Sequence, residues 1–252
     1  MPKKDYSSIL ITGASSGLGR ALALGYAAPG VRLVLSGRDA ERLGRVAAEC
    51  RSLGAEVADA VIDVRDAGAM TAWMTAADDT RSLDLIIANA GVSANTSDAG
   101  DTARRIAETN IDGTLNTAAP LLERLCARRH GQIAIVSSLA AFHGMPSTPT
   151  YGASKAWCKS YGEALRGRLD RHNIGVSVIC PGFVESRITA ANRFPMPMIM
   201  TAEKAAAIIK RGLAKNRPRI AFPLPIYFMA WFLGCLPPGW TGRLFANLPD
   251  KE

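Results

Sequence analysis

Cysteine is scarce in this sequence, and its five copies among 252 residues are scattered. They show no C-x-x-C spacing and their number is odd, which argues against a disulfide framework and against a zinc site. A reducing compartment fits this usage, and we expect no bound metal. The cysteines are Cys50, Cys126, Cys158, Cys180 and Cys235.

Long apolar runs are also scarce. The stretch from Ile220 to Gly242 carries no charge, but its prolines leave an apolar core of about 11 residues, short of the roughly 20 that cross a bilayer. We therefore expect no transmembrane span. The first apolar run begins at Ile9, too early for a secretory signal, so we expect a cytoplasmic protein.

Acidic residues are outnumbered, since 30 Lys and Arg face 22 Asp and Glu, for a formal charge of +8 and a pI near 9.5. Such an excess suits nucleic acid, anionic lipid, an acidic carrier or a phosphorylated cofactor. The basic residues are spread over separate amphipathic segments, with no interleaved aromatic stripe. We therefore expect solvated helix faces and no nucleic-acid partner.

Short apolar runs alternate with longer amphipathic stretches along the whole chain. The runs are too short for helices and nearly continuously apolar, as is typical of strands buried on both faces. This order predicts a single-domain α/β fold, a Rossmann-type doubly wound parallel sheet of about seven strands in three layers. Ligands of such sheets bind beyond the carboxyl ends of the strands.

The predicted strands are Ile9–Thr12, Val31–Ser36, Glu56–Ile62, Leu83–Ala88, Gln132–Ser137, Val176–Cys180 and Arg219–Phe222. The predicted helices are Arg20–Ala28, Asp39–Leu53, Ala67–Asp79, Asp101–Arg129, Thr150–His172 and Thr201–Lys215.

A glycine-rich loop follows the first predicted strand, with glycines at 13, 17 and 19 in a G-x3-G-x-G spacing. Glycines permit a tight turn and a close approach of the backbone to a ligand. The following helix N-terminus offers free N–H groups to a pyrophosphate. Because the loop joins a strand to a helix, it predicts dinucleotide binding.

The end of the second predicted strand bears on which dinucleotide binds. An acidic residue there would favour NAD, but Gly37 and Arg38 follow the strand instead. A guanidinium can bind a 2′-phosphate through paired hydrogen bonds, so we expect NADP(H) in preference to NAD(H). Asp39 can cap the next helix. Asp63, after the third strand, suits a contact to the adenine ring or a helix cap.

Tyr151 and Lys155 stand four residues apart, so on a helix they share one face. A phenol normally loses its proton near pH 10, and a nearby ammonium favours the phenolate, which makes proton exchange at neutral pH easier. Ser138, at a predicted strand end, can donate a hydrogen bond to a substrate oxygen. A tyrosine and lysine at this spacing are common on surfaces, and it is the glycine loop and the serine that favour a catalytic role.

These motifs together resemble those of the classical short-chain dehydrogenase/reductase (SDR) family over residues 7–222. The matching residues stand in order along the chain: Thr12-Gly13-x3-Gly17-x-Gly19, Asp63-Val64, Ala88-Asn89-Ala90-Gly91, Asn110, Ser138, Tyr151-x3-Lys155 and Pro181-Gly182.

The resemblance implies a role for each catalytic position. Tyr151 would be the general acid in reduction and the general base in oxidation, and Lys155 would bind the nicotinamide ribose and favour the phenolate. Ser138 would orient the substrate oxygen. Asn110 would hold a water of the proton relay, and since Asn is a poor helix former, we expect a local helix distortion there that frees a backbone carbonyl.

The resemblance also implies a set of cofactor-binding residues, in which Val184 and the Ser186 hydroxyl would contact the carboxamide. With Tyr151 and Lys155, the expected set is Gly13, Ser15, Ser16, Gly17, Leu18, Gly19, Arg38, Asp63, Val64, Asn89, Ala90, Gly91, Pro181, Gly182, Val184 and Ser186.

Residues 1–222 are predicted to form the catalytic and dinucleotide-binding domain, and residues 223–252 an apolar helical extension. Three interpretations of the extension stay open: packing on its own domain or a sister subunit, cover for an apolar substrate pocket, and contact with a membrane surface aided by Arg217, Arg219 and Arg243. The loop 194–200 occupies the family's variable substrate-lid region, and its methionines suit an apolar pocket. His143 faces the substrate or the solvent.

The sequence therefore predicts an NADP(H)-dependent oxidoreductase that transfers a hydride between nicotinamide and a carbonyl or secondary alcohol of a fairly apolar small molecule. One alternative is a 3-oxoacyl thioester reductase acting on an acidic carrier protein, which the basic charge would suit. An alternative of another class is a non-catalytic binding protein on the same fold. Resemblance to the family implies a homodimer or homotetramer.

Overall fold

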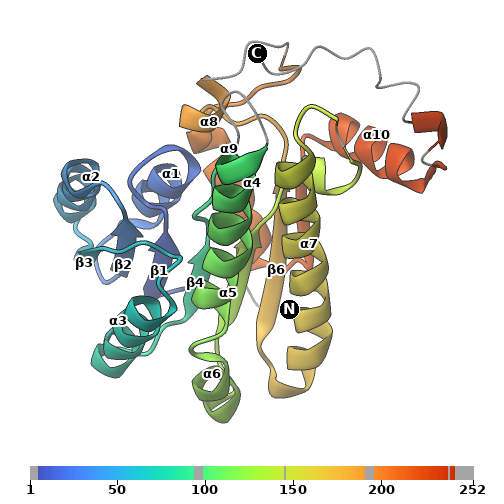
Figure 1. The fold of residues 1–252 in the computed structure, drawn as a ribbon. Coiled ribbons are helices and arrows are strands. Elements are labelled where there is room, and N and C mark those ends of the chain that lie inside the picture. The colour runs from blue at the N-terminus through green and yellow to red at the C-terminus, as the bar shows by residue number, and fades with distance from the viewer. Residues whose placement is uncertain (1–4, 94–98, 145, 191–195, 238, 242–252) are drawn as a thin grey trace.

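A computed structural model of the chain describes residues 5–93, 99–144, 146–190, 196–237 and 239–241. It contains one parallel sheet in the order β3-β2-β1-β4-β5-β6-β7. Helices cover both of its faces (Figure 1). This is the Rossmann-type, three-layer, single-domain arrangement that the alternation of runs predicted.

The strands are β1 (Ser8–Thr12), β2 (Arg32–Gly37), β3 (Glu56–Val61), β4 (Leu85–Ala88), β5 (Gln132–Val136), β6 (Gly175–Pro181) and β7 (Arg219–Phe222). The longer helices are α1 (Gly17–Tyr26), α2 (Ala40–Ser52), α3 (Ala67–Thr80), α4 (Gly100–Ala107), α7 (Pro149–Leu169), α9 (Ala202–Ala214) and α10 (Leu224–Cys235). Shorter ones are η1 (Glu108–Asp112), α5 (Gly113–Ala118), α6 (Leu122–Arg128), η2 (Leu139–Ala141), η3 (Asp170–His172) and α8 (Arg187–Ala190).

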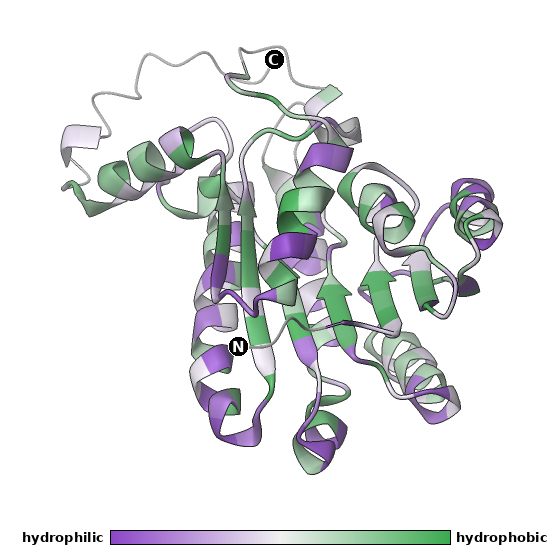
Figure 2. Cartoon of the chain, turned by 180° about the vertical axis from the view of Figure 1, so that it is seen from behind, coloured by the Kyte–Doolittle hydropathy of each residue, from purple (hydrophilic) through white to green (hydrophobic). Residues whose placement is uncertain are grey.

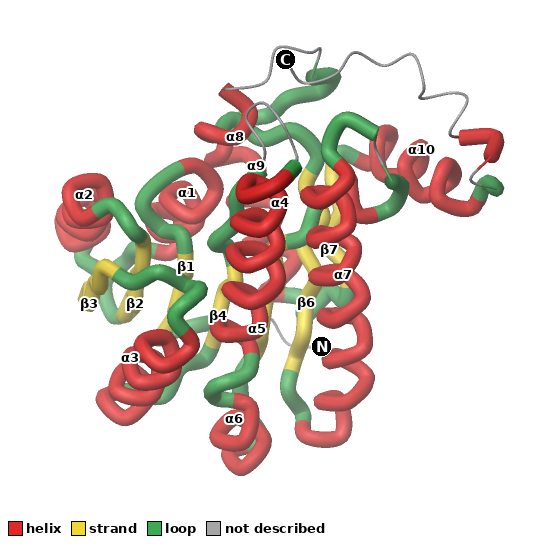
Figure 3. The backbone as a smooth tube through the Cα atoms, viewed as in Figure 1, coloured by secondary structure: helices red, strands yellow, loops and turns green. Residues whose placement is uncertain are grey.

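Alternate residues of the central strands enter two separate cores. Ile9 and Ile11 of β1 pack with α1, α2 and α9, whereas Leu10 packs on the other face with residues of α3, α6 and α7. This follows from the period of two along a strand. Figure 2 shows the resulting apolar strands between helices with mixed surfaces, and Figure 3 shows the loops that connect them.

Two expectations about the elements are wrong. Strand β3 is not buried on both faces, because it is an edge strand with exposed residues such as Val61, which is 57% exposed. The predicted helix Asp101–Arg129 is interrupted twice. It passes through the π-helical turn η1, and it breaks between α5 and α6, where Pro120 lacks the N–H that would continue the helix.

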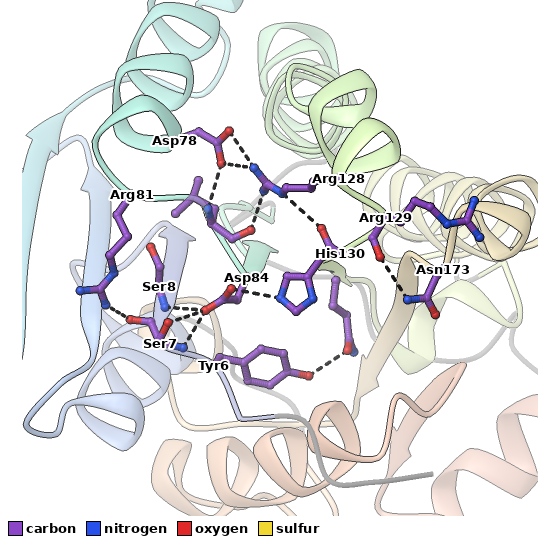
Figure 4. Close-up of polar contacts among 12 residues, drawn as sticks. Tyr6, Ser7, Ser8, Asp78, Arg81, Asp84, Arg128, Arg129, His130 and Asn173 are labelled. Carbon is purple, nitrogen blue, oxygen red and sulfur yellow. Dashed lines mark hydrogen bonds and ion pairs between the residues drawn. The ribbon is translucent and has the colours of Figure 1, made fainter.

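A polar network connects the amino-terminal ends of the strands (Figure 4). The carboxylate of Asp84, just before β4, accepts hydrogen bonds from the Ser7 backbone N–H at 2.8 Å, the Ser7 hydroxyl at 2.8 Å and the Ser8 backbone N–H at 3.0 Å. His130 Nε2 lies 3.2 Å from its other oxygen. This single side chain therefore joins the starts of β1, β4 and β5 at the edge opposite to the strands' carboxyl ends.

Asp84 makes the stability of the fold depend on pH. Burial works against its charged form, but the hydrogen bonds from Ser7, Ser8 and His130 outweigh burial and hold the pKa of Asp84 below its usual value. A lowered folded-state pKa stabilises the protein above the unfolded-state pKa of about 3.9, and this stabilisation is lost as the pH falls through the folded value.

We expect Asp84→Asn to lower the free energy of unfolding by about 2 kcal/mol at pH 7, because an amide cannot replace a charged acceptor of three donors. The difference from wild type should shrink when urea unfolding is repeated below pH 4. Asp112→Asn, at an exposed carboxylate, is the control and should unfold like wild type. A deficit of Asp84→Asn that does not vary with pH would contradict this account.

Candidate active site

A cleft of about 380 Å³ opens at the carboxyl edge of the sheet. Its walls come from the segments that follow β1 to β6, so that residues far apart in sequence meet there. Most of the predicted cofactor residues are among those lining it: Gly13, Ser15, Ser16, Gly17, Leu18, Gly19, Arg38, Val64, Asn89, Ala90, Gly91, Tyr151, Lys155, Pro181, Gly182, Val184 and Ser186.

The glycine loop forms the floor of the cleft, between β1 and α1. Gly13 has a φ of +66°, and a Cβ there would lie 2.8 Å from the Cα of Ala90. A Cβ on Gly19 would collide with the carbonyl oxygen of Gly13. The side-chain amide of Asn89 donates to the carbonyls of Thr12 (2.9 Å) and Gly13 (3.2 Å). The loop is therefore packed against the end of β4 too closely for side chains.

Two arginines line the cleft beyond β2. Arg38 lines the cleft and is exposed. Arg42, one turn into α2, was not predicted, and it lines the same part of the cleft. Asp39 caps α2 by accepting from Arg42 N at 2.9 Å, and its carboxylate pairs with the Arg42 guanidinium at 2.7 Å. The helix-cap role of Asp39 is thus confirmed.

Asp63 pairs with an arginine two residues further along the chain and does not cap the next helix. Its carboxylate pairs with the Arg65 guanidinium at 2.7 Å and accepts from the Arg65 backbone N–H at 3.0 Å. These hydrogen bonds outweigh partial burial and keep the pKa of Asp63 below its usual value. Asp66, not Asp63, caps α3. Ile62 and Val64, on either side of Asp63, line the cleft.

Asn110 lies within the π-helical turn η1, so the predicted helix distortion is confirmed. Its buried side chain accepts from Val92 N at 2.8 Å and donates to Val92 O at 3.0 Å and to Ser154 Oγ at 2.9 Å. The backbone carbonyl of Asn110, which was expected to be freed by the distortion, has hydrogen-bond partners. It accepts hydrogen bonds from the side chains of Thr114 (2.6 Å) and Cys158 (3.3 Å).

Tyr151 and Lys155 lie on the first turns of α7 and both line the cleft. Lys155 is 4% exposed. Its Nζ donates to the carbonyl of Val136 at 3.0 Å and lies 5.9 Å from the centre of the Tyr151 ring. A Cβ on Gly91 would lie 3.1 Å from this Nζ, so glycine leaves room for the ammonium.

The two serines after β5 differ in position. Ser138 caps η2, and its hydroxyl accepts from Ala140 N at 3.1 Å. Ser137, which sequence reasoning missed, lines the cleft, and its hydroxyl donates to the carbonyl of Lys155 at 2.6 Å. The continuous apolar run before them gave no sign of which serine would face the cleft.

The segment after β6 closes the cleft on the side of the glycine loop. A Cβ on Gly17 would lie 3.1 Å from the Cβ of Ser186. Ser186 and Thr189 bond to each other, with Ser186 N donating to Thr189 Oγ1 at 2.8 Å, and Thr189 Oγ1 donating to Val184 O at 2.9 Å. Thr189 also lines the cleft and was not predicted.

His143 lies away from this cleft. Its Nδ1 is 2.6 Å from the carbonyl oxygen of Gly144, and it borders a second hollow between η2 and α7. In the predicted lid loop, Phe194 and Pro195 lie outside the described residues, whereas Met198 and Ile199 are 53% and 42% exposed.

Comparison with known proteins agrees with the family resemblance of the sequence motifs. Residues 7–195 match the family model described as short chain dehydrogenase. The chain belongs to the short-chain dehydrogenase family. An uncharacterized oxidoreductase of Myxococcus xanthus is 37% identical over 227 residues, which cover 88% of this chain and 90% of that protein. The chain is thus an oxidoreductase of this family, and its substrate is expected among small molecules.

Solved structures share the fold. A short chain dehydrogenase/reductase from Burkholderia phymatum in complex with NAD has a TM-score of 0.82 and 25% identity, covering 91% of this chain and 93% of that one. A 3-ketoacyl-ACP reductase from Sinorhizobium meliloti 1021 has a TM-score of 0.75 and 27% identity, covering 88% and 99%. The family binds a nicotinamide cofactor, as the first of these structures does.

The close packing of the glycine loop can be tested by Gly19→Ala. The added methyl group meets the Gly13 carbonyl, so we expect dinucleotide binding to be lost and the melting temperature to fall. Gly44→Ala is the matched control, because a Cβ there meets nothing within 4 Å inside α2, and the helix should gain up to about 1 kcal/mol. Fluorescence titration with NADPH and thermal melts would measure both effects. Unimpaired binding by Gly19→Ala would contradict the assignment of the loop.

Proposed function

We propose that this enzyme is an NADP(H)-dependent reductase or dehydrogenase acting on the carbonyl or secondary alcohol of a fairly apolar small molecule. The observation that carries the proposal is the burial of the Lys155 ammonium beside the Tyr151 ring, in the same cleft as the glycine loop. A phenol at a ligand-binding edge can give a proton to a substrate oxygen or take one from it.

The cleft fits a nicotinamide dinucleotide. Its floor is a glycine loop at the N-terminus of α1, where free N–H groups and the helix dipole favour a pyrophosphate. Pro181, Gly182, Val184 and Ser186 also line the cleft, and Val184 and Ser186 would contact the carboxamide. When bound, the nicotinamide supplies or accepts the hydride.

The protein's own side chains handle the proton. Tyr151 gives its phenolic proton to the substrate oxygen in reduction and takes a proton from the hydroxyl in oxidation. Lys155 would hold the nicotinamide ribose, with its positive charge beside the Tyr151 ring. Ser138 holds the substrate oxygen by donating its hydroxyl proton to it, while the Ser138 oxygen still accepts from Ala140 N. Asn110 positions the proton relay through its side-chain hydrogen bonds to the Val92 backbone N–H and the Ser154 hydroxyl.

The preference for NADP(H) rests on two guanidinium groups. Arg38 is exposed beside the end of β2, and Arg42 follows it by one helical turn. The Arg42 guanidinium lines the cleft and pairs with the Asp39 carboxylate at 2.7 Å. A 2′-phosphate between the two arginines would accept charge-assisted hydrogen bonds from both.

A second candidate substrate is a 3-oxoacyl thioester on an acidic carrier protein. It is supported by the similarity to the 3-ketoacyl-ACP reductase of Sinorhizobium meliloti and by the charge of +8. Both candidates predict consumption of NADPH, so a panel of ketones, aldehydes, steroids and acyl thioesters distinguishes them by which class is turned over.

Tyr151→Phe tests the proton-transfer role. Removing the hydroxyl should lower kcat by about 10²- to 10⁴-fold, the usual contribution of general acid–base catalysis, with NADPH affinity kept. Tyr161→Phe is the control, since Tyr161 stacks on Trp157 farther along the same helix and should leave kcat unchanged. Substantial turnover by Tyr151→Phe on the best substrate of the panel would refute the role.

Arg38→Asp tests the cofactor preference. A carboxylate repels a 2′-phosphate and can accept hydrogen bonds from a ribose hydroxyl, so the ratio of kcat/KM for NADPH to that for NADH should fall by at least about tenfold. Arg42→Ala should change the ratio in the same direction. Arg45→Asp, at the exposed face of α2, is the control. An unchanged ratio in both cleft variants would show that the guanidinium groups do not select the cofactor.

A further inference from the structure

Helix α10 carries an exposed apolar stripe that the proposed reaction does not use. Leu224, Phe228 and Trp231, at positions i, i+4 and i+7, are 58%, 58% and 50% exposed. Phe232 continues the stripe and Met229 borders it, at 58% and 55% exposed. Helix α10 has no charged residue. Figures 1 and 2 show it as a largely apolar helix projecting beside the upper end of α7.

The opposite side of α10 is packed on the domain, so the stripe is held outward. The Tyr227 ring meets the Phe142 ring edge-on at 5.4 Å, and its hydroxyl accepts from Arg219 at 3.1 Å. Ile226 packs on the cluster of Leu139, Val178 and Cys180. A Cβ on Gly234 would collide with the carbonyl oxygen of Phe142. The helix therefore cannot turn its stripe inward without losing these contacts.

Along the sequence, the charges that flank α10 on either side are of one sign, and in the structure Arg219 also pairs with Glu163 of α7. Between Glu203 and Asp250 the sequence contains no acidic residue. It contains these basic residues: Lys204, Lys210, Arg211, Lys215, Arg217, Arg219 and Arg243. Helix α10 is uncharged and aromatic, and the chain that flanks it in sequence is basic. An anionic bilayer is complementary to such a segment, because its interior is apolar and its headgroups are negative.

The size of the stripe favours a lipid surface over a second copy of the chain. Aromatic side chains bury 150–250 Å² each, so the exposed halves of Phe228, Trp231 and Phe232 amount to roughly 300 Å², and Leu224 and Met229 bring the stripe to roughly 500 Å². A stable protein–protein interface needs about 800 Å² from each partner. Exposed tryptophan, such as Trp231 and Trp240, is typical of membrane–water interfaces.

We propose that α10 docks on the surface of an anionic lipid bilayer, with its apolar stripe inserted and its axis in the plane of the interface. At 12 residues it is too short to span. It follows β7 and contacts η2, which follows β5, so it lies at the carboxyl edge where the cleft opens. Docking would bring the cleft near the bilayer, where apolar carbonyl compounds dissolve. This goes beyond the proposed reaction, and vesicle binding is measured without turnover.

The test is flotation of the full-length protein with vesicles of phosphatidylcholine, alone or mixed with phosphatidylglycerol. We expect the wild type to float with the anionic vesicles, and less with the neutral ones or at high salt. Phe228→Glu should lower the bound fraction by about tenfold or more, because it replaces an inserted ring by a charge. Leu53→Glu, at an exposed leucine 49% accessible after α2, is the matched control and should bind like wild type.

A second measurement does not depend on a charged variant. Tryptophan fluorescence should shift to the blue on addition of anionic vesicles, and Trp231→Phe, which keeps the stripe apolar, should bind normally with a smaller shift. Failure of the wild type to float, or flotation of Phe228→Glu equal to that of Leu53→Glu, would overturn the proposal. The proposal would also be overturned if the wild type formed an oligomer and bound no vesicles, and Phe228→Glu dissociated that oligomer. In that case α10 would pack on a second copy of the chain. Loss of activity in Tyr151→Phe bears only on the reaction.

Discussion

An ammonium loses its hydration when it is buried, and the protein has to replace it with hydrogen-bond acceptors. Lys155 donates to the carbonyl of Val136 at the end of β5, and the Ser137 hydroxyl donates back to the Lys155 carbonyl. These two bonds fix α7 against β5. Asn110 continues the network from Ser154, the neighbour of Lys155, to Val92 beyond β4. The buried ammonium and the polar side chains beside it thus join two strand ends, the π-helical turn and a long helix.

The sequence predicted the fold almost completely, because each buried strand is a continuous apolar run and each helix is amphipathic. Such signals are local, and the order of strands and helices along the chain then limits the topology to a doubly wound sheet. One of the two errors comes from neighbours in space, and the other from a local signal that was outweighed. Val61 belongs to an apolar run, but its strand lies at the sheet edge and has one neighbour only. Pro120 was a local signal of a helix break that the long amphipathic pattern obscured.

The site was predictable where a motif carries its own geometry. Tyr151 and Lys155 share a helix face because of their spacing, and the glycines of the loop follow directly from β1. Ser137, Arg42 and Thr189 were not predictable, since their positions in the cleft depend on how distant segments pack. The pairing of Asp63 with Arg65 likewise reflects a turn that composition does not reveal. The resemblance to the family indicated which residues matter, but not which hydrogen bonds each one makes.

The network around Asp84 has a practical consequence for handling the enzyme. Tyr6 and Ser7 are anchored at the amino edge, with the Tyr6 hydroxyl donating to Gln132 at the start of β5. A linker joined ahead of Tyr6 would leave the molecule on the side away from the cleft. Immobilisation through that end would present the glycine loop and Tyr151 to the bulk solution.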